Sequence, residues 1–223
     1  MTREPISSDL IVLVPDMDAE TTVRAVLARH QALGIRPIAF DVRRHVQRDS
    51  GCRSDCHHFL RLSLQNYRYA MVLFDDEGSG REGLERTQLD LAFELALHTN
   101  GWQDRAAVVV LDPELEAWVW SDSPEVDTAL GWTGRDPPLR PWVQSSTHYW
   151  VRGGPKPERP KEAFDSALRA VGKAHSASIF EDIAGRVSLV RCTDPAFVKF
   201  KGCLQRWFPV SGLGADMAPG EVT

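Results

Sequence analysis

Cysteine is scarce in this chain, with four residues among 223, at positions 52, 56, 192 and 203. So few cysteines argue against a disulfide framework, and in a reducing compartment these thiols would stay free. Long apolar runs are also missing, because none approaches the roughly 20 residues of a membrane span. The N-terminal segment lacks the basic stretch and the small-residue cleavage site of a secretory signal. We therefore expect a cytoplasmic protein without a membrane segment.

Neither sign of charge dominates the chain. The formal net charge of −5 argues against a surface that binds nucleic acid everywhere, but it leaves room for a local basic patch. The phosphate-binding motif G-x-x-x-x-G-K-[ST] is absent, and we expect neither ATP nor a dinucleotide as cofactor. A hydrophobic content of 43% and a charged content of 26% are typical of soluble globular proteins.

The apolar pattern predicts strands that alternate with helices. Strands are predicted at residues 10–14, 35–42, 69–75 and 106–111, with Pro37 placing the second at a sheet edge or a strand start. Helices are predicted at residues 16–33 and 84–98, the latter with Leu84, Leu91 and Leu95 on its apolar face. Residues 43–58 are predicted to form a surface loop before a helix at 59–66. This alternation indicates βαβ units and a mostly parallel central sheet flanked by helices, an α/β fold.

Three segments follow from these patterns. Residues 1–120 form the predicted α/β core, and residues 121–208 an irregular excursion followed by C-terminal helices packed on that core. The excursion is rich in proline and tryptophan, and helices are predicted at residues 161–173, 178–187 and 196–207, the last opened by Asp194-Pro195. Residues 209–223 are predicted to be a flexible tail.

Acidic residues follow three of the predicted strands. Because parallel strands end at one edge of a sheet about 5 Å apart, such acids can converge on a hard divalent cation, Mg²⁺ or Mn²⁺. A cation there would serve phosphoryl chemistry. The alternative is that the acids cap helices and solubilise loops. The three groups are Asp16, Asp18 and Glu20; Asp75, Asp76 and Glu77; and Asp112, Glu114 and Glu116.

Two further sets of residues could carry chemistry. Cys52, Cys56 and the pair His57-His58 could bind zinc, although no second ligand pair follows, and reduced thiols in a polar segment are the alternative. Arginines in and after the same segment could contact phosphate, or could be solvated loop charges. They stand at positions 43, 44, 48, 53 and 61. Basic residues between 152 and 173, Lys161 among them, could steady a developing negative charge, or could be surface charges.

The strand that ends in Asp75-Asp76-Glu77, preceded by a strand with an acidic loop, resembles the toprim fold of topoisomerases, primases and OLD-type nucleases. Residues 113–118, PELEAW, are similar to a P-E-x-E-A-W signature of a bacterial toprim-like family related to the OLD and RloB groups, associated with phage-defence gene clusters of the methylation-associated type. The family's closing pattern resembles residues 156–168 and 179–207.

The resemblance implies a component of an anti-phage defence system with a Mg²⁺- or Mn²⁺-dependent nuclease site. It implies that Asp16, Asp75, Glu77 and Glu116 hold the metal and, with Lys161, act in phosphodiester hydrolysis. Where the family has Val-Glu-Gly after the first strand, this chain has Val14-Pro15-Asp16.

That departure leaves a second hypothesis open, a catalytically inactive scaffold or regulatory subunit. On the first hypothesis the expected partner is nucleic acid. On the second the partners are other defence proteins, bound through the tryptophan-rich residues 118–150.

Overall fold

Four parallel strands form the centre of the molecule. The computed structural model describes residues 7–76, 86–151 and 153–210. The strands are β1 (Ser8–Val14), β2 (Phe40–Arg44), β3 (Tyr67–Asp75) and β4 (Ala106–Leu111), and their order in the sheet is β2-β1-β3-β4. All three pairings are parallel, so the predicted α/β fold with a parallel sheet is confirmed.

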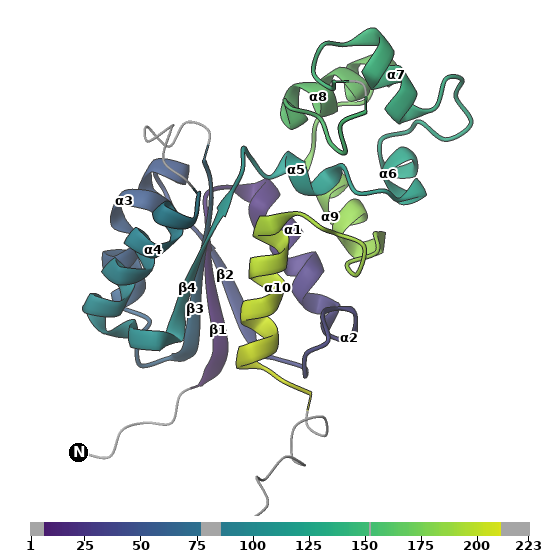
Figure 1. Cartoon of the computed structure of the whole chain (residues 1–223). Helices are drawn as coiled ribbons and strands as arrows, with labels where there is room; N and C mark the ends of the chain where they lie inside the picture. Colours follow the sequence, from purple (N-terminus) through teal and green to yellow (C-terminus); the bar gives the residue numbers. More distant parts are fainter. Residues whose placement is uncertain (1–6, 77–85, 152, 211–223) are drawn as a thin grey trace, which may run out of the picture.

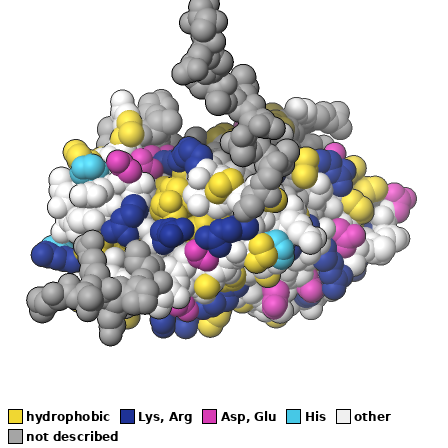
Figure 2. All heavy atoms as spheres, turned by 90° about the horizontal axis from the view of Figure 1, so that it is seen from below, with side chains coloured by type: hydrophobic (Ala, Val, Ile, Leu, Met, Phe, Trp, Pro, Cys, Tyr) yellow, Lys and Arg dark blue, Asp and Glu magenta, His cyan; other side chains and the backbone are white. Residues whose placement is uncertain are grey.

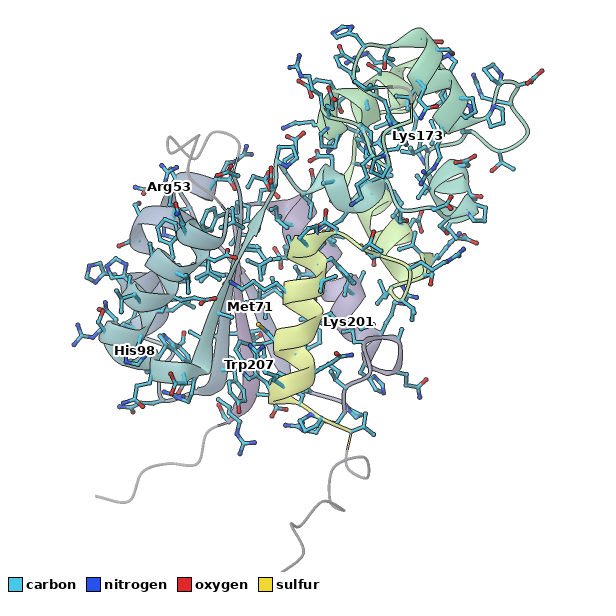
Figure 3. All side chains as sticks on the ribbon, viewed as in Figure 1. Arg53, Met71, His98, Lys173, Lys201 and Trp207 are labelled. Carbon is cyan, nitrogen blue, oxygen red and sulfur yellow. The ribbon has the colours of Figure 1, made fainter. Side chains whose placement is uncertain are left out.

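Helices cover both faces of the sheet (Figure 1). On one face lie α1 (Met17–Ala28), α2 (His30–Leu33) and α10 (Pro195–Trp207), and on the other lie α3 (Arg48–Arg61) and α4 (Arg86–Leu97). Met71 of β3 lies between these layers, with Lys201 of α10 on one side and Arg53 of α3 on the other (Figure 3). Each face has its own apolar core because alternate strand residues point to opposite sides.

The connections change sides between β1 and β3. After β1 the chain enters α1 on one face, whereas after β3 it enters α4 on the opposite face (Figure 1). The two strands are neighbours, with Leu13 opposite Val72. In open α/β sheets such a switch point leaves a crevice beyond the carboxyl ends of the strands, where ligands bind. This places Asp16 and Asp75 on the two sides of that crevice.

The second strand is shorter than predicted. It begins at Phe40 rather than at residue 35, because residues 35–39 are bonded elsewhere. The Ile35 N–H donates to the His30 carbonyl at 3.0 Å, and Arg36 pairs with Asp9. Gly34, with φ of 73°, ends α2 in the left-handed conformation that glycine favours. The edge position predicted from Pro37 is confirmed.

The prediction of a loop at residues 43–58 is wrong, because helix α3 begins at Arg48 and ends at Arg61. Cys52, Cys56 and Leu60 recur at helical spacing and are fully buried against the sheet. Most of the residues between them are polar and at least partly exposed, so the segment is a helix with a narrow apolar stripe. The predicted helix at 59–66 continues only to Arg61, and residues 62–66 form turns.

Helix α4 confirms the predicted helix but reverses its predicted faces. Leu91 and Leu95 are 65% and 62% exposed, whereas Asp90 is only 3% exposed. The Asp90 carboxylate accepts from the Val110 N–H, and Glu94 from the Val108 N–H, each at 3.1 Å. These carboxylates therefore accept from N–H groups at the outer edge of β4, which none of the described strands covers. Leu84 lies outside the described residues.

Lys199 of α10 reaches the same edge from the other face of the sheet. Its ammonium lies 2.9 Å from Asp90 Oδ2 and 2.8 Å from Glu94 Oε1. The edge strand is thus closed by side chains from two helices, a common protection against pairing with another chain.

The excursion after β4 forms a lobe of short helices beside the sheet (Figure 1). Its elements are α5 (Glu116–Val119), α6 (Pro124–Ala129), α7 (Leu139–Ser146), α8 (Pro160–Val171) and α9 (Ala177–Arg186). The last three predicted helices are confirmed with shifts of one or two residues, and the Asp194 side chain caps α10 as predicted. In the described part of the chain, no helix has the length and apolarity needed to cross a membrane.

The tryptophans of residues 118–150 are core residues, not an exposed contact surface. Trp118, Trp120, Trp132 and Trp150 are buried, and Trp142 packs partly buried against the same core. The four buried indole N–H groups of this segment have acceptors: Asp194 for Trp118, the Pro160 carbonyl for Trp120, the Pro137 carbonyl for Trp132 and the Gly154 carbonyl for Trp150. The expectation that these aromatics form a docking face is therefore wrong.

Candidate functional site

Asp16 lies directly after β1 and begins α1. Its Oδ1 accepts from the Ala19 N–H at 3.0 Å, which satisfies one of the free N–H groups of the first helical turn. One carboxylate oxygen of Asp16, Oδ1, is therefore occupied by the helix cap. The side chain still lies close enough to Asp49 and Asp75 for its charge to raise the pKa of both.

Asp75 ends β3 on the other side of the crevice. Its backbone N–H donates to Asp49 Oδ1, and its own Oδ1 accepts from the Leu115 N–H, both at 3.0 Å. Loss of hydration and the charges of Asp49, Glu116, Asp16 and Glu114 raise the pKa of Asp75 well above its usual range. Carboxylates from three other segments therefore act electrostatically on the end of β3.

Glu114 and Glu116 enter this cluster from the segment after β4. Both are buried, and Glu114 Oε1 accepts from the Lys161 N–H at 2.9 Å. Burial and then the charge of Glu114 raise the pKa of Glu116 to about 7. Glu116 can thus bind or release a proton near neutral pH, which is the property required of a general acid or base.

Lys161 brings a positive charge to the acidic cluster. Burial alone would lower its pKa, but the charges of Glu116, Glu114 and Asp75 outweigh burial and raise it. The lysine stands in the first turn of α8, distant in sequence from the strand ends. The structure therefore brings together four of the five predicted site residues: Asp16, Asp75, Glu116 and Lys161. The fifth, Glu77, lies outside the described residues.

Other predicted acids point elsewhere. Asp18 pairs with His175 at 2.8 Å, Glu20 pairs with Arg24 and Arg44 at 2.9 Å, and Asp112 is exposed. The acidic turn after β1 is thus divided: Asp16 faces the cluster, and the other two carboxylates form ion pairs. The alternative that these acids cap a helix is confirmed for Asp16, whereas Asp18 and Glu20 are in ion pairs.

Asp49 is a cluster residue that the sequence analysis did not identify. It stands in the first turn of α3 and so reaches the carboxyl edge of the sheet from the β2 side. Partial burial raises its pKa, although the hydrogen bond from the Asp75 N–H opposes this shift. Asp49 stands a few residues after a predicted strand, which could have identified it as a candidate. It was not identified because its segment was predicted to be a loop.

The predicted zinc site is not formed. Cys52 and Cys56 face the sheet, and burial raises the pKa of both thiols, that of Cys56 to about 11. His57 and His58 lie on the outer side of α3, where their rings are tilted relative to each other with centroids 4.1 Å apart. The thiols and imidazoles therefore cannot converge on one ion.

The carboxylate cluster fits a hard divalent cation in its chemistry. Its donors are all oxygen atoms, and three of its carboxyls, Asp49, Asp75 and Glu116, have a raised pKa that a cation would lower. Within the described ranges, however, no three His, Cys, Asp or Glu side chains are close enough together to hold a metal ion. A bound cation would thus require these carboxylates to move together or to be joined by a residue outside those ranges.

Residues 78–83, GSGREG, match the G-x-G-x-x-G spacing of a dinucleotide-binding turn and stand between β3 and α4. The expectation that no dinucleotide binds overlooked this match. The motif lies outside the described residues, and a lone match has a high false-positive rate. We assign it no role.

Comparison of the chain with protein-family models, with curated proteins and with solved structures gives no match. Its function must therefore be argued from the geometry of the site.

Proposed function

We propose that this protein hydrolyses phosphodiester bonds in nucleic acid with the help of Mg²⁺ or Mn²⁺, as a toprim-like component of an anti-phage defence system. The observation that carries the proposal is the surroundings of Asp75. This carboxyl lies at the end of a central strand beside a switch point, with a strongly raised pKa and four further carboxyls around it. The link to defence rests on the resemblance of residues 113–118 alone.

Asp75, Glu116, Asp49 and Asp16 would hold the cation, with Glu77 as a further ligand that the resemblance implies. A divalent cation at such a site polarises a phosphate and lowers the pKa of bound water. The Leu115 N–H orients the Asp75 carboxylate, and the Asp49 carboxylate anchors the backbone N–H of Asp75. Glu116 can hold or release a proton near pH 7, and Lys161 supplies positive charge beside it.

Asp75→Asn tests this proposal because the amide keeps an oxygen for the Leu115 N–H and removes only the charge. We expect the affinity for Mn²⁺ and Mg²⁺, measured by calorimetry, to fall about 10- to 100-fold. Cleavage of plasmid DNA or RNA should be lost in the same variant and in Glu77→Gln. Asp112→Asn is the matched control, since Asp112 is an exposed acid at the same edge. Unchanged cation binding and cleavage in Asp75→Asn would rule out this site.

A second candidate function is a non-catalytic scaffold or regulatory subunit. Two observations favour it: Asp16 uses one oxygen as a helix cap, and the described residues contain no ready group of metal ligands. In this case calorimetry should detect no Mg²⁺ or Mn²⁺ binding to the wild type, and partner proteins should co-purify with Asp75→Asn as well as with the wild type.

A further inference from the structure

An open groove lies beside the acidic cluster, between the end of β2 and the beginnings of α1 and α3. It encloses about 1090 Å³ that is continuous with solvent. Four arginines line it, Arg24, Arg43, Arg44 and Arg48, and Asp16 lies at its border with the cluster. Of the cluster residues, Asp16 is the one that lines the groove, so the groove and the proposed site adjoin at Asp16.

A short connection, residues 45–47, joins Arg43 and Arg44 at the end of β2 to Arg48 at the start of α3. His45 is buried within it, and its Nδ1 accepts from the Gln47 N–H at 3.1 Å. Arg48 has a left-handed backbone with φ of 52°, which is unfavourable for a residue other than glycine. The Arg48 N–H donates to the His45 carbonyl at 3.1 Å. Strain retained in a loop of this kind is often associated with a functional site.

The charged side chains at the end of β2 and the start of α3 point in two directions. Asp49 bonds inward to the Asp75 N–H, whereas the exposed Arg43, Arg44 and Arg48 line the groove. Arg44 pairs with Glu20 and Arg43 lies beside the Tyr67 hydroxyl, but within the described ranges neither Arg43 nor Arg48 forms a salt bridge. In a chain with a net charge of −5, this groove thus concentrates positive charge next to a cluster that would repel phosphate.

Two exposed apolar side chains complete the groove. Met17 is 47% exposed and Val46 is 90% exposed, and both line it. Apolar surface beside arginines suits unstacked bases, because bases pack on apolar side chains and on guanidinium planes. A duplex would keep its bases away from such a surface.

We infer that this groove binds the backbone of single-stranded nucleic acid and guides it to the acidic cluster. Arg43 and Arg48 contact phosphates that flank the scissile one, and Met17 and Val46 contact the bases. The inference rests on the proposed function, since it names the substrate class and the path of the substrate.

Binding of a fluorescent 12-nucleotide single strand, measured by anisotropy in EDTA, tests the groove without cleavage. The double substitution Arg43→Gln/Arg48→Gln should weaken binding about tenfold at 0.1 M salt. It should also reduce the slope of log K against log salt by about 1.4, the value for two phosphate contacts on a single strand. Thermal unfolding of the variant verifies that it is folded.

The surface at the amino ends of the strands, opposite the proposed site, supplies a matched control. Lys and Arg side chains also gather on that face (Figure 2), and Arg68 and Arg206 are exposed, near the start of β3 and the end of α10. Arg68→Gln/Arg206→Gln removes the same charge and should leave binding within about twofold of the wild type. An equal loss in both double variants would overturn the inference, as would tighter binding of a duplex of the same length.

The proposed function and the proposed groove can be tested independently, because different results would contradict each of them. Arginine-dependent binding of the single strand without cleavage in Mg²⁺ would support the groove and contradict the hydrolytic function. Cleavage that persists undiminished in Arg43→Gln/Arg48→Gln would support the function and contradict the groove.

Discussion

Gly51 shows how closely the loop before α3 is packed. A Cβ at this position would lie 1.8 Å from His45 Nδ1 and 2.2 Å from His45 Cε1, so the imidazole would have to move. The His45 ring also packs on Phe59 and lies 3.6 Å from the Asp55 carboxylate, which limits that movement.

We therefore expect Gly51→Ala to destabilise the protein by about 1–3 kcal/mol, the usual cost of overpacking. Gly202→Ala is the control, because Gly202 is also helical but a Cβ there meets nothing within 4 Å. That substitution should stabilise the protein by about 0.5–1 kcal/mol through helix propensity. Urea denaturation measures both, and a stabilised Gly51→Ala would show that His45 moves freely.

Residue identities alone could predict part of the site. Asp16, Asp75 and Glu116 follow apolar strands, and strand ends of a parallel sheet share an edge, so their approach could be predicted. Asp49 could not, because its segment has only a narrow apolar stripe and was interpreted as a loop. The hydrophobic pattern predicted that Leu91 and Leu95 face the sheet, and this is wrong. The side of α4 that faces β4 instead carries Asp90 and Glu94, which accept hydrogen bonds from the free N–H groups of that strand.

Among the elements, α1 and α8 are joined by His175. Its Nε2 lies 2.8 Å from Asp18 of α1, its Nδ1 lies 3.2 Å from Asp165 of α8, and its ring packs against Phe164 and Phe180. Burial alone would lower the pKa of His175, but the hydrogen bonds to Asp18 and Asp165 outweigh it and raise the pKa. The protonated imidazole therefore holds α8, and with it Lys161, near the sheet.

This junction makes stability depend on pH. A raised histidine pKa stabilises the fold fully below the unfolded value of about 6.5, and the contribution is lost as pH rises through the folded pKa. His175→Asn should remove this dependence. Since the ring is more than one third exposed, we expect an effect of at most about 1 kcal/mol. NMR titration of the imidazole measures the pKa directly, and a value at or below about 6.5 would contradict the predicted junction.

The covered edge of β4 gives a second prediction for the elements. Asp90→Ala removes the acceptor of the Val110 N–H and a partner of Lys199. We expect a loss of about 1–3 kcal/mol in the free energy of unfolding, because a buried N–H is left without that acceptor.

Asp182→Ala is the control for Asp90. Asp182 pairs with Arg186 at 3.5 Å, and both side chains are more than half exposed, so its loss should cost less than about 0.5 kcal/mol. Similar urea midpoints for the two variants would show that the edge does not depend on Asp90.

For the whole molecule, the lobe and one face of the sheet share a single apolar core. Leu10 and Val109 of the sheet belong to the same buried cluster as Trp132, Val143 and Trp150 of the lobe. We therefore expect one cooperative thermal transition, with tryptophan fluorescence and far-UV circular dichroism giving the same midpoint. Two separate midpoints would show that the lobe unfolds as an independent unit.

The segment where the chain leaves the sheet, at α5, lies next to the segment where it returns, at the start of α10. Trp118 Nε1 donates to Asp194 Oδ1 at 3.1 Å, and Lys156 donates to Asp194 Oδ2 and to the Ala117 carbonyl at 3.0 and 2.7 Å. The entry and exit of the intervening segment are thus fastened together, as in an inserted domain. We therefore expect the segment between α5 and α8 to tolerate changes in length without a change in the order of the strands. In homologous proteins, the greatest differences in length are accordingly expected between α5 and α8, while the spacing from β1 to Asp75 stays constant.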